Sequence, residues 1–230
     1  MEEIDYEVIN MLLILVPFIL SIFAQSLVMG KYNKYLKVEN GIGLTGKEAA
    51  ERFLRDNDVT DVSIAQTNGS LSDHYDPTKK VIYLSSSVYH GTSVSAVAIA
   101  CHEVGHAIQH NQGYSFIKVR SALVKPVQFA NQFSWILIIF GLLLSFSGLF
   151  WTGIVLFSTI AIFQLVTLPV ELNASYRARE YLANVVTGER QQQGVRVVLR
   201  SAAFTYVVGL IASLAEILRF VLLFVRNNRD

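Results

Sequence analysis

Three residues near the middle of the chain, His102, Glu103 and His106, have the types and spacing of a hydrolytic metal site. They form the pattern His-Glu-x-x-His, and residues four apart share one face of an α-helix, so both imidazoles can reach the same Zn²⁺ ion. Glu103 could then take a proton from a zinc-bound water without ligating the metal. The pattern predicts zinc-assisted hydrolysis of peptide bonds. The competing interpretation is a surface helix with two histidines and an unrelated glutamate.

A third protein ligand must come from another part of the chain. The longer zinc pattern, with a glycine and a further histidine after the second histidine, fails because Gln109 and Gln112 occupy those positions. His110 lies one turn further along the same face, and the helix would have to bend for it to reach the metal. A downstream carboxylate is therefore expected, and Glu171 and Glu180 are the two candidates. The spacing alone does not choose between them.

The residues around this pattern predict a helix outside the membrane. Thr92 or Ser93 can cap it, and apolar residues follow at helical spacing. Its apolar part, residues 94–101, is far too short to cross a bilayer, which needs about 20 residues. We expect the helix to lie at or above the membrane surface.

The polar segment before this helix has the composition of a soluble α+β domain. Thr45 and Glu48 form a capping box that opens a helix. Strand-like patterns at residues 61–66 and 80–84 are separated by turn residues, so a small sheet is expected.

Four apolar runs predict four transmembrane helices. The chain has 230 residues, of which 52% are hydrophobic, and its mean hydropathy is +0.41, which is typical of a membrane protein. The first run covers residues 11–29 and follows acidic residues, unlike a signal peptide. The run at 127–170 has no charged residue and is long enough for two spans joined by a hairpin, and the last covers 201–225. Glu216 and Arg219 in the last run lie three residues apart, so they could pair within the helix bundle or extend their charged ends toward the membrane interface, and the second interpretation is favoured.

Basic residues predict the orientation of these spans. They concentrate before the second span and between the third and fourth spans, as follows: Lys31, Lys34, Lys37, Lys118, Arg120, Lys125, Arg177, Arg179, Arg190, Arg196 and Arg200. Positive residues are retained on the cytoplasmic side, and with four spans both polar segments fall on one side. The two parts of a metal site could therefore meet at the cytoplasmic face of the membrane.

The remaining composition excludes several functions. The net charge is only +1 and no basic block is present, so we expect no nucleic-acid partner. Cys101 is the only cysteine, which rules out an intrachain disulfide and a cysteine zinc cluster. The absence of charges from the middle two spans disfavours a transporter.

Four sequence blocks make the chain resemble the YugP-type family of membrane-bound neutral zinc metallopeptidases, which is similar to the HtpX-like gluzincins. The blocks are Leu71-Ser72-Asp73-His74-Tyr75-Asp76-Pro77, Ile82-Tyr83-Leu84-Ser85, Ala100-Cys101-His102-Glu103-Val104-Gly105-His106-Ala107-Ile108-Gln109 and Leu168-Pro169-Val170-Glu171-Leu172-Asn173-Ala174-Ser175. The resemblance implies that Glu171 is the third zinc ligand, because the family has an acid just after Leu-Pro-Val. It also implies that residues 80–84 form the edge strand on which a peptide substrate lies.

Together these features predict a mainly α membrane protein with four transmembrane helices and a small α+β zincin-like cytoplasmic domain containing the His-Glu-x-x-His helix. The expected division is an acidic tail and first span (1–30), the zincin-like domain (31–126), a transmembrane hairpin (127–170), a helical segment with the third ligand (171–200) and the last span (201–230).

The predicted function is that of a membrane-embedded zinc endopeptidase with one Zn²⁺ per chain. Its metal ligands would be His102, His106 and Glu171, and Glu103 would be the catalytic base. Its partners would be the lipid bilayer and a peptide or membrane-protein substrate, while a homo-oligomer and a membrane-protein partner both stay open. The alternative is a non-catalytic, zinc-stabilised membrane scaffold or chaperone-like adaptor.

Overall fold

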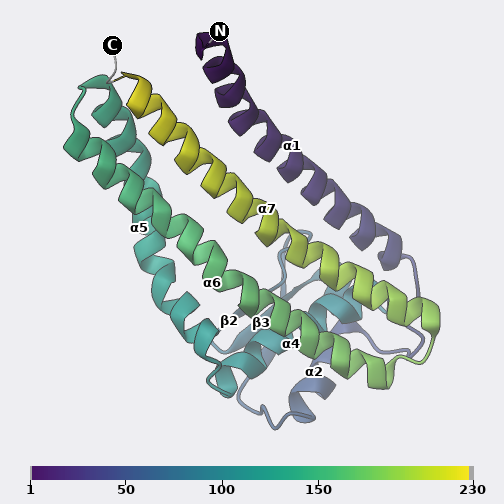
Figure 1. Ribbon diagram of the computed structural model, residues 1–230. Helices are drawn as coiled ribbons and strands as arrows, with labels where there is room; N and C mark the ends of the chain where they lie inside the picture. The colour runs from purple at the N-terminus through teal and green to yellow at the C-terminus, as the bar shows by residue number, and fades with distance from the viewer. Residues whose placement is uncertain (1, 228–230) are drawn as a thin grey trace. The chain divides into compact units, whose positions relative to one another are not determined.

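The computed structural model describes residues 2–227 and is mainly helical (Figure 1). Its helices and strands follow in chain order: α1 Glu2–Leu36, α2 Gly46–Arg55, β1 Ser63–Thr67, β2 His74–Asp76, β3 Val81–Ser85, α3 Ser86–Tyr89, α4 Val94–Asn111, α5 Ser115–Leu143, α6 Ser147–Val185 and α7 Glu189–Asn227. Within the described residues, α1, α5, α6 and α7 are long and apolar enough to cross a membrane. The prediction of four membrane-length apolar helices is confirmed.

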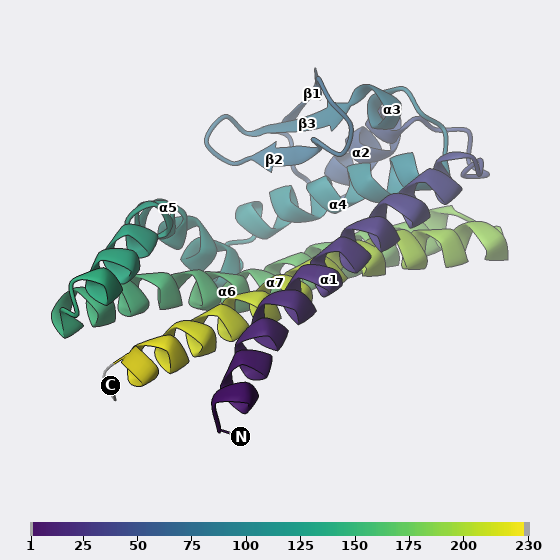
Figure 2. The ribbon, with the colours of Figure 1, turned by 90° about the horizontal axis from the view of Figure 1, so that it is seen from above.

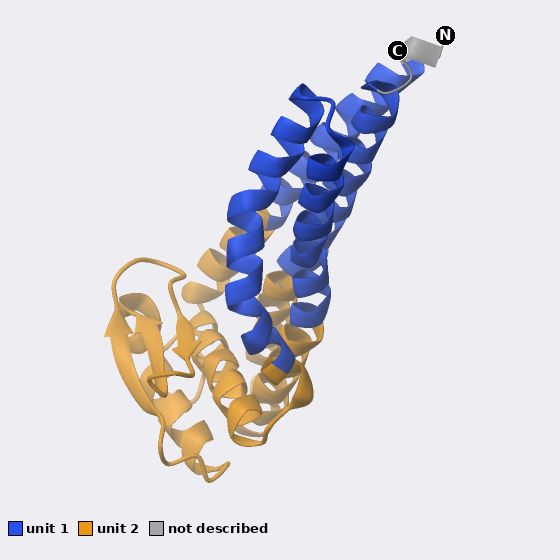
Figure 3. Cartoon of the chain, turned by 90° about the vertical axis from the view of Figure 1, so that its left-hand side faces the viewer, with its two compact units in different colours: residues 1–24, 119–168, 205–230 blue, residues 25–118, 169–204 orange. Residues whose placement is uncertain are grey.

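The chain divides into two compact units, which we describe separately (Figure 3). Unit 1 comprises Met1–Ala24, Val119–Leu168 and Thr205–Asp230. Unit 2 comprises Gln25–Lys118 and Pro169–Phe204 and contains the sheet and helix α4.

Unit 1 consists of apolar helical segments packed through small residues. The α5–α6 hairpin turns between Leu143 and Ser147, and its helices approach so closely that a Cβ on Gly141 would lie 2.4 Å from the backbone nitrogen of Phe150. Between α6 and α7, the Ser213 hydroxyl donates to the Gln164 side chain at 2.6 Å. Such small and polar contacts are typical of helix packing inside a bilayer, where lipid supplies no hydrophobic contrast.

Unit 2 contains a three-stranded sheet in the order β1-β3-β2. Strand β1 pairs with β3 in parallel, and β2 pairs with β3 antiparallel, with Tyr75 opposite Ile82. The expectation that residues 80–84 form an edge strand is therefore wrong. Strand β3, Val81–Ser85, is flanked on both sides, because the short β2 segment pairs with it where the sequence pattern suggested only a turn. Among the strands of the described residues, β1 and β2 form the two edges of this sheet.

Helix α4 is the central element of unit 2, and Figure 2 shows the sheet lying against it. It is buried against α2, whose capping box between Thr45 and Glu48 is confirmed, and against strands β2 and β3. The Ser93 hydroxyl accepts a hydrogen bond from the Ala96 N–H at 3.1 Å, which satisfies one of the free amide groups at the start of the helix. Burial on almost every side fixes α4 firmly, so the residues it carries are held in one orientation.

Candidate metal centre

Helix α4 positions His102, Glu103 and His106 below the surface of unit 2. Glu103 and His106 are buried, and the side chain of His102 is only 13% exposed. Gly105, between the two histidines, lies against helix α6, where an added Cβ would be 2.8 Å from the carbonyl oxygen of Ala174. The missing side chain thus lets the two helices approach closely enough to share a site.

Helix α6 contributes the third member of the cluster, Glu171. One of its carboxylate oxygens, Oε2, lies 3.2 Å from Nε2 of His102 and 3.6 Å from Nε2 of His106. These three residues are the group of potential ligands within the described chain whose atoms all lie within 4.8 Å of one another. Two ligands bound to a tetrahedral zinc at about 2.05 Å lie roughly 3.3 Å apart. The distances from Glu171 to the two histidines are close to this value, so the three residues suit a zinc ion with two imidazole ligands and one carboxylate ligand.

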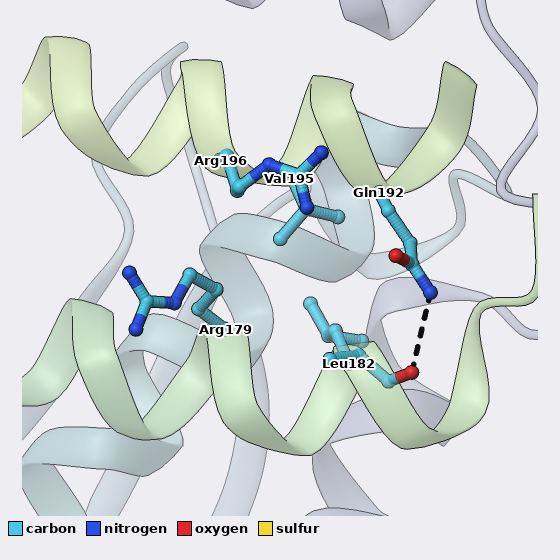
Figure 4. Close-up of a pocket in the computed structure, with 6 residues that line it drawn as sticks. Arg179, Leu182, Gln192, Val195 and Arg196 are labelled. Carbon is cyan, nitrogen blue, oxygen red and sulfur yellow. Dashed lines mark hydrogen bonds between the residues drawn. The ribbon is translucent and has the colours of Figure 1, made fainter. Parts of the chain in front are cut away.

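The other candidate acid, Glu180, lies outside this cluster. Its side chain is 54% exposed and lies 3.3 Å from a guanidinium nitrogen of Arg179. Figure 4 shows Arg179 beside a depression between α6 and α7 that is also lined by Leu182, Ala183, Gln192, Val195 and Arg196. The side chains that line it are two arginines, one glutamine and three apolar residues, and they include no imidazole, thiolate or carboxylate to bind a Zn²⁺ ion.

Both histidines have a hydrogen-bonding partner on the ring nitrogen that faces away from Glu171. Nδ1 of His102 lies 3.2 Å from the Ser175 hydroxyl, and Nδ1 of His106 lies 3.0 Å from Oε1 of Gln109. Partners of this kind orient metal-binding imidazoles and leave Nε2 for the metal. Neither partner was predicted from the sequence. Gln109 had been considered only as a residue that breaks a longer zinc pattern, although a glutamine three residues after a histidine lies on the same helix face.

The Nε2 atoms and the Glu171 carboxylate form a set of donor atoms that can bind a cation. An imidazole that donates from Nδ1 has a lone pair on Nε2, and a carboxylate has only acceptors. Such acceptors facing one another in a buried position repel unless a proton or a metal ion lies between them. The chemistry of the donor set therefore fits zinc.

Glu103 is a buried carboxylate with a raised pKa. Burial raises its pKa to about 7, while the nearby His102 lowers it and the charges of Glu171 and Asp73 raise it further. The backbone of Tyr75, on strand β2, acts in the opposite direction by hydrogen bonding. A carboxylate with a pKa near neutrality can both accept and return a proton.

Comparison with known proteins identifies the family. Residues 10–225 match the model of a family described as "Putative neutral zinc metallopeptidase". This chain belongs to that family. It is also similar to "Putative membrane protease YugP" of Bacillus subtilis (strain 168), with 44% identity over 212 residues that cover 92% of this chain and 94% of the relative. No solved structure matches the chain. The family assignment agrees with the predicted resemblance.

Proposed function

We propose that this chain is a membrane-embedded zinc endopeptidase of the gluzincin type, which cleaves membrane proteins or peptides near the cytoplasmic face. The observation that carries the proposal is the convergence of His102, His106 and Glu171, with Glu103 adjacent on the same helix as His102. Membership of a zinc metallopeptidase family and similarity to a relative named as a membrane protease support the same function.

The residues of the site divide the proposed reaction between them. His102, His106 and Glu171 would hold the ion, which when bound lowers the pKa of a water molecule and polarises a carbonyl group. Glu103 would take the proton of the attacking water and return it to the leaving amine. Its burial keeps bulk water away from the carboxylate and brings its pKa to about 7, close to the value at which both transfers are efficient.

The location of the proposed activity follows from charge and from hydropathy. The segments that carry the site, residues 31–126 and 171–200, also carry the larger share of the basic residues near the ends of the apolar helices. Basic residues are retained on the cytoplasmic side, which supports a cytoplasmic site.

Substitution of Glu103 by Gln tests the proposal, because it keeps the shape of the side chain and removes the base. We expect Glu103→Gln to bind zinc as the wild type does and to cleave casein or a membrane-protein substrate about 10²–10⁴-fold more slowly. Metal analysis and a cleavage assay on the purified full-length protein measure the two properties. Glu180→Gln, which removes an exposed carboxylate outside the cluster, is the matched control and should retain activity. Undiminished cleavage by Glu103→Gln would refute the assigned base, and a wild type that binds zinc but cleaves nothing would favour a zinc-stabilised scaffold.

A further inference from the structure

A chain of hydrogen bonds leads from the metal centre toward the surface of unit 2. Gln109 is fully buried, and its Oε1 contacts Nδ1 of His106 at 3.0 Å. Its amide nitrogen donates to the carbonyl oxygen of Val170 at 2.8 Å and to Oδ1 of Asn173 at 3.0 Å. Arg177 donates to the same Asn173 oxygen at 2.8 Å and to Oε1 of Gln112 at 2.8 Å. These contacts link helix α4 to residues on both sides of Glu171.

The chemistry of these groups determines which atom donates and which accepts in each of these hydrogen bonds. Arginine has only donors, so Asn173 must present its oxygen to Arg177, and that same oxygen is the one that faces Gln109. The Val170 carbonyl is also an acceptor and cannot be reversed. Two acceptors therefore face one end of the Gln109 amide, so this end must be the NH₂ group. The other end, which faces His106, must be the carbonyl oxygen.

We propose that Gln109, oriented by Val170 and by the Arg177–Asn173 pair, is a positioning residue that holds His106 in the tautomer protonated on Nδ1. A carbonyl oxygen can only accept, so Nδ1 of His106 must carry the proton that it donates. The lone pair of His106 is then on Nε2, which faces Glu171. Gln109 thus fixes which nitrogen a metal would meet, and this consequence rests on the proposed zinc function.

The surroundings of His102 do not determine which of its ring nitrogens carries the proton. Its Nδ1 contacts the Ser175 hydroxyl, which can donate or accept. His106 is therefore the histidine whose ligand atom is set in advance by the protein, and an arginine three hydrogen bonds away contributes to that setting.

The tautomer can be observed directly by NMR of the zinc-free, full-length protein with ¹⁵N-labelled histidine. The spectrum is recorded in detergent at a pH where imidazoles are neutral, and His106→Gln assigns the signal. His106 has two competing acceptors: Oε1 of Gln109 at 3.0 Å from Nδ1 and Oε2 of Glu171 at 3.6 Å from Nε2. We expect the Nδ1–H form in the wild type and a shift toward the Nε2–H form in Gln109→Leu. A wild type mainly in the Nε2–H form, or a tautomer unchanged in a folded Gln109→Leu variant, would overturn the proposal.

Zinc affinity, measured by competition with a chelator, provides a second test with a matched pair of variants. Gln109→Leu should weaken zinc binding roughly 10–100-fold, the usual effect of losing a partner that orients a ligand. Asn173→Leu should have a smaller effect, because the Val170 carbonyl still orients Gln109. Asn173→Asp keeps an acceptor oxygen for both Gln109 and Arg177 and should bind zinc within about twofold of wild type.

Equal losses in Asn173→Asp and Asn173→Leu would contradict an orienting role of this oxygen. Thermal unfolding of each metal-free variant shows whether a loss of affinity exceeds a loss of stability. If the wild type binds no zinc, the proposed function fails, whereas the NMR result still decides the tautomer.

Discussion

Helix α6 carries two glutamates, nine residues apart, in contrasting surroundings. Glu171 is buried beside two histidines of α4, and the backbones approach closely there at Gly105 and Ala174. Glu180 is exposed and contacts only a neighbouring, exposed arginine among the ion pairs of the described residues. Both residues are acids near arginines in the sequence. Glu171 is distinguished as a potential metal ligand because it is buried beside the ring nitrogens of two histidines, whereas Glu180 is a solvated surface charge.

The two glutamates differ in how their negative charge is compensated. A buried carboxylate costs free energy unless another group offsets its charge, so its position must be compensated by neighbouring side chains or by an ion. An exposed carboxylate is stabilised by water, and its ion pair contributes little. Three sets of substitutions test this contrast between a buried and an exposed carboxylate.

Removal of each carboxylate should separate the two regions most clearly. We expect Glu171→Ala to weaken zinc binding by more than about 100-fold, because even partners that only orient a ligand contribute about 10–100-fold. Glu180→Ala should leave zinc affinity unchanged. Metal analysis and chelator competition on both purified variants measure the effect. Loss of zinc from Glu180→Ala, with Glu171→Ala unaffected, would reverse the assignment.

The close approach of α4 and α6 provides the second test. In Gly105→Ala the new Cβ would lie 2.8 Å from the carbonyl oxygen and 3.0 Å from the Cα of Ala174, so one helix must shift. We expect a net loss of stability of about 1–2 kcal/mol despite the better helix propensity of alanine, together with weaker zinc binding.

Gly30→Ala is the matched control for this substitution. Gly30 is an exposed glycine in helix α1, and its added Cβ would meet no atom within 4 Å. It should gain up to about 1 kcal/mol from helix propensity alone. Thermal unfolding in detergent compares the two variants, and an unchanged melting temperature for Gly105→Ala would mean that the helices are not held this closely.

The membrane-length helices were the most predictable part of the fold, because their apolar runs are long and almost free of charge. The cap at Thr45 was also predicted correctly, and Ser93 was one of the two caps expected for α4, since a cap depends on residues close in sequence. The position of strand β3 in the middle of its sheet was not predicted, because strand order depends on pairing with residues outside the strand. Strand β2 is three residues long and gives almost no periodic signal.

The candidate site divides in the same way. His102, Glu103 and His106 could be recognised because one helix sets their spacing. Glu171 and Glu180 could not be distinguished by spacing, because the choice depends on which face of α6 meets α4. Gln109 was missed because its partners, Val170 and Asn173, lie 61 and 64 residues away in the sequence. A hydrogen-bond network between helices becomes visible only when both helices are in place.

The exposed pair of Arg179 and Glu180 should show the smallest effect of the three. Their side chains are 43% and 54% exposed, so water screens the attraction between the charges, and the loss of side-chain conformational entropy opposes the pairing. A double-mutant cycle with Arg179→Gln and Glu180→Gln should give a coupling energy below about 1 kcal/mol and unchanged zinc affinity. The pair of Lys47 and Glu51, 3.6 Å apart and 37% and 40% exposed, is a comparable control and should give a similarly small coupling. A coupling energy above about 2 kcal/mol at Arg179 and Glu180, but not at the control pair, would mean that this part of α6 is shielded from water in the membrane-bound protein. Glu171 and Glu180 would then differ in the side chains that they contact and not in their burial.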